Sequence, residues 1–218
     1  MAGLIFVLVL LLLILLFAFL LCYDALSLRM ERKHHRGKIY RILYQYADEE
    51  DCYLLNDVRV FLSKDEMEPT KVDHILFTEK YIYLINDFLA FGGIYGNVRD
   101  ASLFLKRTDG KVQTIPNPVF IGKELVRDFE DDVMIGHEKH AFIAMTVYNP
   151  SLVVPKGIHV KDYESCFLSV EELAETIRNS QDDSVSPFSD EKVKLLVDII
   201  KERSDRVKEQ METNKKKK

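Results

Sequence analysis

The chain lacks the short motifs that identify several large enzyme classes. Its 218 residues contain no glycine-rich phosphate loop, no G-x-S-x-G turn, no dinucleotide fingerprint and no H-E-x-x-H pair. Each of these motifs positions a phosphate, a nucleophile or a zinc ion through its spacing. The sequence therefore gives no support to nucleotide-binding, serine-hydrolase or zincin chemistry.

Cysteine is also scarce, with three residues in the chain. Cys22 lies in an apolar run, and Cys52 and Cys166 are far apart and belong to no C-x-x-C pair. This spacing supports neither a disulfide framework nor a zinc site, and reduced thiols are expected in a cytoplasmic domain.

Charge is absent from one long stretch, Leu4 to Cys22, which also contains no turn-forming residue. As a helix this stretch is about 28 Å long, enough to cross the hydrocarbon core of a bilayer. A helix in a soluble core would have a polar face, and this stretch has none. We therefore predict one transmembrane helix in residues 1–23.

Two other interpretations of this stretch fit less well. A cleaved signal peptide has a basic N-terminal region and ends in small residues. Here nothing basic precedes Leu4, and the stretch ends Phe19-Leu20-Leu21-Cys22. A lipid-modified Cys22 would be expected to follow a small residue, and Leu21 is large. The sequence favours an uncleaved anchor.

Basic residues flank the anchor on one side only. They are Arg29, Arg32, Lys33, Arg36 and Lys38. Because Lys and Arg are retained on the cytoplasmic side, we predict a single-pass protein of the cell membrane with its C-terminal domain in the cytoplasm. Tyr23 suits the membrane interface. The basic residues set this topology and could also bind anionic lipid head groups.

The remainder of the chain is acidic. Removing the +3 of residues 24–38 and the +4 of Lys215–Lys218 from the overall −5 leaves −12 on residues 39–214. Nucleic-acid binding depends on a basic footprint that neutralises phosphates. The acidic body therefore disfavours nucleic acid and leaves membrane lipids and a protein as the expected partners.

The pattern beyond the anchor predicts an α/β domain, an α+β arrangement around a mixed sheet. Helices are expected at 38–47, at 118–132, after a capping box at Ser169–Glu172, and after a cap at Ser189. Strands are expected at 53–62, 72–77, 81–85, 102–106, 111–115, 141–148 and 158–161, with turns at 78–80, 92–96 and 108–110.

The last helix has an apolar face that thins after Arg203, where we expect the helix to be solvated. This face consists of Val193, Leu196, Val197 and Ile200. It either packs on the domain or is free for a partner.

Several short segments, in order, resemble the nuclease-related domain (NERD) family. Val72-Asp73-His74-Ile75-Leu76-Phe77 resembles its apolar-Asp-His strand, and Tyr81–Ile85 its next strand. Gly93–Asn97 resembles its glycine-rich turn, Asn117-Pro118 its Asn-Pro pair, and Gly37 the opening of the domain.

This resemblance implies a restriction-endonuclease-like core, a mixed sheet flanked by helices. It also implies an Asp on one strand, a Glu-x-Lys on the next and a Glu in the first helix. Carboxylates of this kind hold Mg²⁺ or Mn²⁺ against a phosphate, and the lysine orients water.

Most of the implied residues are replaced in this chain. The Asp is present as Asp73, but the Glu-x-Lys falls on Asn86-Asp87-Phe88 and the helix Glu on Lys38. The Gln expected after Asn-Pro falls on Ile121. One carboxylate of three survives, whereas a hard cation needs several.

Asp87 is the possible substitute for the missing carboxylate. Neighbours on a strand point to opposite faces, so Asp87 should face away from Asp73 unless a bulge re-aims it. Glu49 or Glu50 could also reach the site from a loop.

We therefore expect a membrane-anchored, catalytically degenerate domain that binds or scaffolds a partner, without a metal or other cofactor. The alternatives are a metal-dependent nuclease that uses Mg²⁺ or Mn²⁺, and a nucleic-acid-binding module without cleavage. The chain divides into an anchor (1–23), a basic juxtamembrane segment (24–36), a nuclease-related-like domain (37–179), a linker (180–188) and a C-terminal amphipathic helix with a basic tail (189–218).

Overall fold

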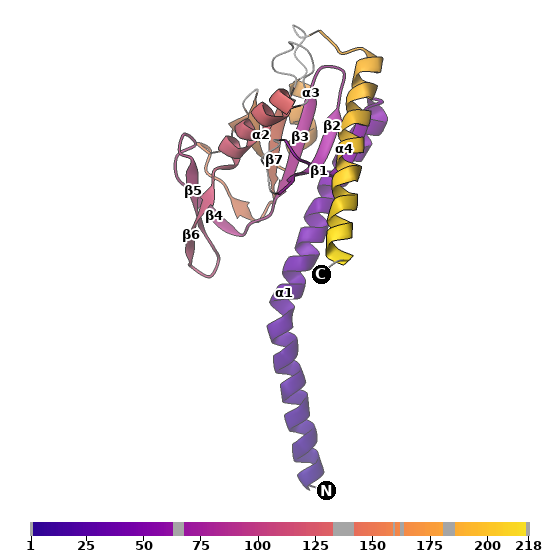
Figure 1. Ribbon diagram of the computed structural model, residues 1–218. Coiled ribbons are helices and arrows are strands. Elements are labelled where there is room, and N and C mark those ends of the chain that lie inside the picture. Colours follow the sequence, from indigo (N-terminus) through magenta and orange to yellow (C-terminus); the bar gives the residue numbers. More distant parts are fainter. Residues whose placement is uncertain are drawn as a thin grey trace. The chain divides into compact units, whose positions relative to one another are not determined.

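The computed structural model describes residues 2–62, 68–132, 142–158, 160–161, 164–180 and 186–216 (Figure 1). The chain divides into two compact units, Met1–Lys38 and Ile39–Lys218. The predicted linker, 180–188, lies partly outside the described residues.

The first unit is formed by the N-terminal part of helix α1, Ala2–Glu49. Leu11, Leu12, Leu13 and Ile14 are four consecutive apolar residues, each at least half exposed. Because successive residues are about 100° apart around a helix, the helix is apolar and exposed on all sides here. The helix predicted at 38–47 is the C-terminal part of this longer helix.

In the described part of the chain, no helix has a stretch that is long and apolar enough to cross a bilayer. The side chains of Leu4, Cys22 and Tyr23 lie outside the described ones. The transmembrane helix therefore stays a prediction.

The second unit is built on a six-stranded mixed sheet with the order β1-β2-β3-β7-β10-β9. Its strands are β1 (Tyr53–Val60), β2 (Thr70–Phe77), β3 (Ile82–Phe88), β7 (Phe142–Tyr148), β9 (Val160–Lys161) and β10 (Ser165–Ser169). The first three are antiparallel neighbours, whereas β3, β7 and β10 are parallel. Parallel neighbours need a crossover, and helix α2 (Pro118–Asp132) belongs to the one between β3 and β7.

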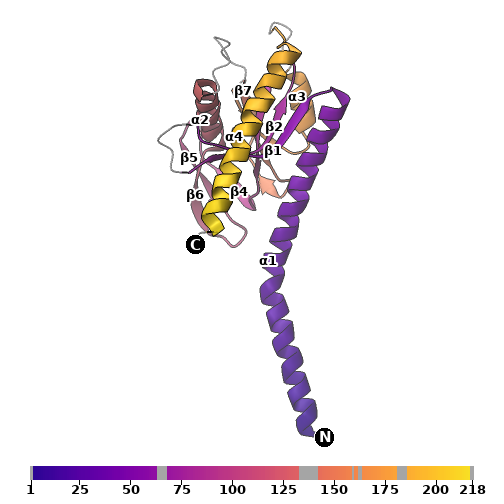
Figure 2. The same cartoon turned by 45° about the vertical axis from the view of Figure 1, so that its right-hand side comes forward.

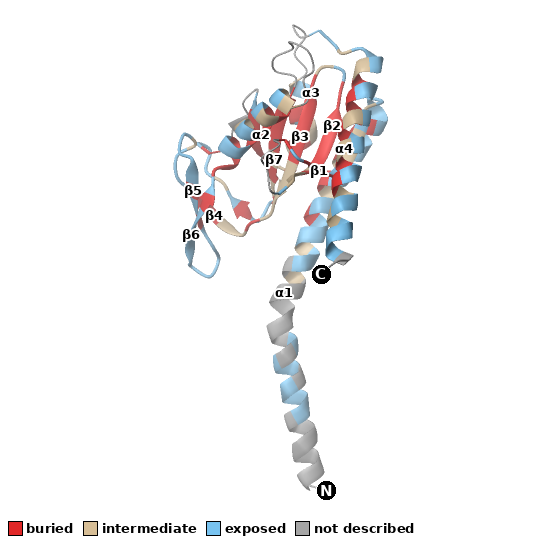
Figure 3. Ribbon diagram, in the orientation of Figure 1, coloured by how far each residue is buried: buried red, intermediate tan, exposed pale blue. Residues whose placement is uncertain are grey.

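Helices cover both faces of this sheet (Figures 1 and 2). One face packs against α2 and α4 (Asp190–Lys216), and the other against the Ile39–Glu49 part of α1 and α3 (Leu173–Asn179). Figure 3 shows the buried central strands between these layers. The predicted mixed α/β class is confirmed.

A second, four-stranded mixed sheet has the order β6-β5-β4-β8. Its strands are β4 (Gly92–Tyr95), β5 (Ser102–Lys106), β6 (Val112–Pro116) and β8 (Leu152–Val153). The predicted turn at 108–110 joins β5 to β6, with Gly110 at a φ of +83°. One face of the sheet packs on a third apolar cluster, which includes Phe88 and Phe167.

The predicted turn at 92–96 is wrong for residues 92–95, because they form β4. Gly92 has a φ of +117°, and a Cβ there would lie 2.0 Å from the backbone oxygen of Lys106. This glycine permits the close approach of β5 rather than a turn. Gly96, with a φ of +135°, lies just after the end of β4.

The strands β8 and β10 were not predicted from the sequence. Four of the five residues of β10 are buried. Because both faces of the sheet are covered there, the strand shows no alternation of polar and apolar residues. A short buried strand of this kind cannot be separated from other apolar runs by periodicity.

The helix caps follow the sequence closely. Asn117 Oδ1 accepts the Val119 N–H at 3.0 Å, and Ser189 Oγ accepts the Lys192 N–H at 3.3 Å. One of the two hydrogen bonds of the predicted capping box is present: Glu172 Oε2 accepts the Ser169 N–H at 3.1 Å. The Ser169 hydroxyl donates to the same carboxylate, and α3 begins only at Leu173.

The last helix packs on the domain and is buried further than predicted. Val207 is 5% exposed, so the apolar face does not end at Arg203. The Arg59 N–H of β1, an edge strand, donates to Ser204 Oγ of α4 at 3.0 Å. Because an uncovered edge strand can pair with other chains, α4 also protects the sheet.

Candidate degenerate active site

The residues that the family resemblance singles out lie on the neighbouring strands β2 and β3. Asp73 is on β2, and Asn86, Asp87 and Phe88 end β3. The backbone ladder between these two strands ends at the pair His74–Ile85. Beyond that point, side chains replace the backbone ladder.

Asp73 makes three contacts, and its two hydrogen bonds with Asn86 and Asp87 join the two strands. Its N–H donates to Asn86 Oδ1 at 3.0 Å, and its Oδ2 accepts the Asp87 N–H at 3.1 Å. Its Oδ1 pairs with the Lys71 ammonium. Both carboxylate oxygens of Asp73 therefore have structural partners.

Lys71 supplies the positive charge beside Asp73. Its ammonium also lies 3.9 Å from Asp57 Oδ1 on β1, and Asp57 is 3.5 Å from Arg59. Two carboxylates on neighbouring strands would repel each other without a cation. Lys71 therefore offsets the repulsion between these two carboxylates.

The strand alternation is interrupted at Asp57. Leu55 and Val58 both contact the same apolar cluster, although they are three residues apart. Asp57 has a φ of +48°, in the left-handed region that Asp tolerates better than most residues. Both Val72 and Ile75 of β2 belong to that cluster too, so β2 shifts its faces at the same level.

Asp87 faces away from the Asp73 carboxylate, as predicted. Its Oδ1 lies 3.4 Å from His74 Nε2, and both side chains are less than a tenth exposed. His74 Nδ1 lies 2.6 Å from Asn56 Oδ1. Asp87 serves this buried pair and does not complete a site with Asp73.

Phe88 falls where the resemblance implies a lysine, and its half-buried side chain packs against the third apolar cluster. Its ring packs edge-to-face on Phe167, with 5.6 Å between the centroids. Phe167 in turn contacts Tyr148 at 4.9 Å. A lysine at this position would place its ammonium group against these apolar rings. Burying a charge without a partner costs free energy.

The other positions give no second carboxylate. Lys38 lies on α1 in the first unit, and Ile121 is an exposed residue of α2. The Glu49 carboxylate accepts from Arg178 Nη2 at 3.0 Å and from Gln45, so the suggestion that it reaches Asp73 is wrong. Glu50 is exposed beyond the end of α1.

Within the described ranges, no group of three or more His, Cys, Asp or Glu side chains is arranged to hold a metal ion. The sequence reasoning missed Asn56, Asp57 and Lys71. Only the register of β1 and β2 indicates that these residues lie near Asp73. The pairs Asn56–His74 and Val58–Val72 place Asp57 level with Asp73. That register could not be read from the sequence alone.

Comparison with known proteins adds no family assignment: no protein-family model, curated protein or solved structure matches this chain.

Proposed function

We propose that this chain is a membrane-anchored, nuclease-related-like protein that has lost metal-dependent catalysis and serves as a binding or scaffolding module at the cytoplasmic face of the cell membrane. The partner bound by the globular unit is a protein. The restriction-endonuclease-like core belongs to this proposal.

The strand arrangement supports that core. A central mixed sheet has helices on both faces, and the Asp73-bearing strand lies next to the strand that carries Asn86 and Phe88. This is the arrangement that the resemblance implies for its catalytic strands.

The observation that carries the loss of catalysis is the pairing of Asp73 with Lys71. The surviving carboxylate is occupied by an internal cation and by the Asp87 N–H. A divalent cation would have to displace that ammonium and would then find the neutral Asn86 beside Asp73. Since hard cations need several carboxylate or carbonyl oxygens to offset their dehydration, this site favours lysine over metal.

Support for the anchor comes from the first unit. Its exposed apolar residues surround the helix axis and include Phe17 and Phe19, each at least 60% exposed. Exposed apolar surface of this extent is unfavourable in water and favourable in lipid.

A metal-dependent nuclease is the alternative that one observation favours. Asp57 and Asp73 share Lys71, so two carboxylates lie on either side of one cation. Removal of that lysine is the change that could make a metal site from them.

Metal binding separates the two proposals. We expect Mn²⁺ titrated into the purified protein to give the same calorimetric trace for the wild-type chain and for Asp73→Ala. Binding by the wild-type chain that Asp73→Ala abolishes would favour the nuclease.

The anchor is tested by membrane extraction. The full chain should stay with membranes after an alkaline wash, and a chain without residues 1–23 should be released. Protease added to inside-out vesicles should digest the C-terminal unit. Protection of that unit would place it on the other side of the membrane.

A further inference from the structure

Four cations of α1 lie on one face of the helix. Arg29, Arg32, Lys33 and Arg36 are spaced i, i+3, i+4 and i+7, which is the spacing of one helix face. All four are exposed, and no acidic residue occupies this face between them. We call these four residues the basic stripe.

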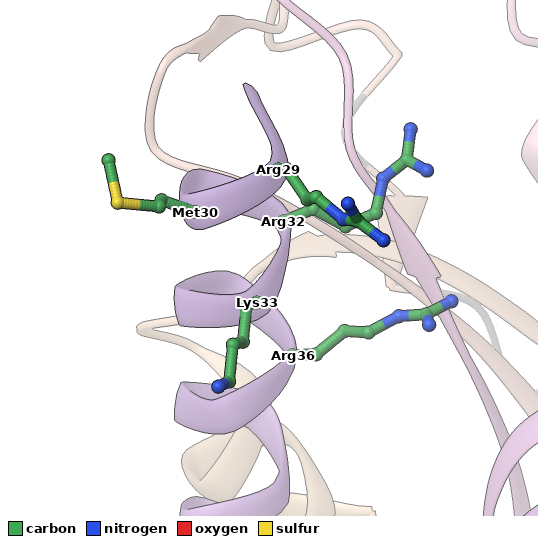
Figure 4. Close-up of a pocket in the computed structure, with 5 residues that line it drawn as sticks. All are labelled: Arg29, Met30, Arg32, Lys33 and Arg36. Atoms are coloured by element: carbon green, nitrogen blue, oxygen red, sulfur yellow. The ribbon is translucent and has the colours of Figure 1, made fainter. Parts of the chain in front are cut away.

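The stripe lines a shallow hollow on the helix surface. Together with Met30 its residues border a space of about 420 Å³. Figure 4 shows the guanidinium groups of Arg29, Arg32 and Arg36 on the same side of α1, with Met30 on the other side. A planar guanidinium donates two parallel hydrogen bonds to a phosphate, so such a face suits phosphate groups.

The distance from the apolar stretch selects the source of the phosphate. At about 1.5 Å per residue, Arg29 is about 10 Å and Arg36 about 21 Å beyond Cys22 along the helix. Helical side chains lean toward the N-terminus, which is the side of the apolar stretch. A head-group layer is roughly 5–8 Å thick, so the first cations reach it directly.

We propose that the basic stripe binds the phosphate groups of anionic phospholipids in the membrane that holds Leu4–Cys22. This inference rests on the proposed anchor. A stripe, unlike a ring of charge, contacts the surface best when α1 tilts toward the cations, and transmembrane helices tilt by about 20° on average. The tilt brings Arg36 within the roughly 8–10 Å over which surface charge is felt.

In the experiment, the full-length protein is incubated with mixed micelles that contain equal amounts of phosphatidylglycerol and phosphatidylcholine. The lipids that co-purify with the protein are then measured. We expect phosphatidylglycerol to be enriched at least about fivefold, because each juxtamembrane cation contributes about 1 kcal/mol near an anionic surface. The enrichment should fall in high salt.

Two matched variants identify the residues. Arg29→Gln, Arg32→Gln, Lys33→Gln and Arg36→Gln are combined in the stripe variant. Lys194→Gln, Lys201→Gln, Arg206→Gln and Lys208→Gln remove the same charge from α4 in the control variant. Enrichment should be lost in the first and kept in the second. Equal enrichment in the stripe variant, or equal loss in both, overturns the proposal.

Two further measurements separate the possible failures. Flotation of the wild-type chain with phosphatidylcholine vesicles after an alkaline wash reports the anchor alone. If the chain floats but shows no enrichment, the lipid proposal fails and the anchor stands; if it does not float, both fail. Single-stranded RNA that binds through the stripe in place of lipid also overturns the proposal.

Discussion

At the scale of the residue, Asp73 has a structural role in the sheet. Its backbone N–H and both carboxylate oxygens have partners on β2 and β3. The side chain therefore fastens two strands where their backbone ladder ends. Residues with such a role are expected to affect stability more than activity.

We predict that Asp73→Ala lowers the free energy of unfolding by about 1–3 kcal/mol, because it leaves the Asp87 N–H and the Lys71 ammonium without their acceptor. Asp198→Ala is the control, since Asp198 is exposed on α4. Its effect should be within about 0.5 kcal/mol. Urea unfolding of both variants measures the difference, and equal midpoints would contradict the structural role.

Cys52 provides a second prediction. Burial, with help from Glu50, Glu79 and Asp51, raises the pKa of its thiol from 9.0 to about 11. The folded state thus favours the neutral thiol, and that contribution to stability is complete below about pH 9 and lost as the pH rises toward about 11.

At about pH 9 the thiolate fraction of Cys52 should be about fiftyfold lower in the folded chain than in the unfolded chain. Alkylation by iodoacetamide, followed by mass spectrometry of the Cys52 peptide, should show a correspondingly slower reaction in the folded protein. The same rate with and without denaturant would contradict the shift.

The identities of Asp73, Asn86 and Phe88 were readable from the sequence, and so was the orientation of Asp87, because strand alternation is a local property. The role of Lys71 was not. It depends on β1 and β2 pairing so that Asp57 comes level with Asp73, and this pairing joins residues that a loop separates.

At the scale of the element, α4 is part of the core rather than an appendix. Val193, Leu196, Val197 and Ile200 complete the apolar cluster on one face of the central sheet. The Phe188 N–H also donates to the backbone carbonyl oxygen of Glu79 at 2.6 Å. This bond connects the segment before α4 to the β2–β3 turn.

Two adjacent leucines of α4 test this packing. Leu196 is 4% exposed and Leu195 is 58% exposed. Leu196→Ala should cost about 2–5 kcal/mol of unfolding free energy, because it leaves a cavity. Leu195→Ala should change it by less than about 0.5 kcal/mol. Similar losses in both variants, measured by urea unfolding, would mean that α4 does not dock through this face.

Gly122 tests the contact of α2 with the sheet. A Cβ at this position would lie 2.1 Å from Ser165 Oγ and 3.1 Å from the Ala144 Cβ. Gly122→Ala should therefore destabilise the fold by about 1–3 kcal/mol, despite the helix preference of alanine. Gly157→Ala meets nothing within 4 Å and is the control. A thermal midpoint for Gly122→Ala at or above that of the wild-type chain would contradict the close contact.

The elements themselves were largely predictable where the pattern was strong. The bounds of α2 agree with the Asn117-Pro118 signal, and the strands of the two hairpins agree with their turns. The fully covered β10 and the glycines of β4 were missed because their structure depends on packing partners from distant parts of the chain.

At the scale of the whole molecule, charge separates the parts of the chain. The cations of residues 24–38 and Lys215–Lys218 lie outside a body with a net charge of −12. This distribution suits a domain held near an anionic surface by its basic segment while its acidic body repels nucleic acid. The scaffold proposal and the lipid proposal both depend on this separation.

The most direct test of the central claim is cleavage of nucleic acid by the purified chain. Single- and double-stranded DNA and RNA are incubated with Mg²⁺ or Mn²⁺, and Asp73→Ala and the stability control Asp198→Ala are assayed in parallel. We predict no cleavage above background, or a trace that all three proteins share. Metal-dependent cleavage that Asp73→Ala abolishes and Asp198→Ala retains would show that Asp73 still serves an active site, and it would contradict the account.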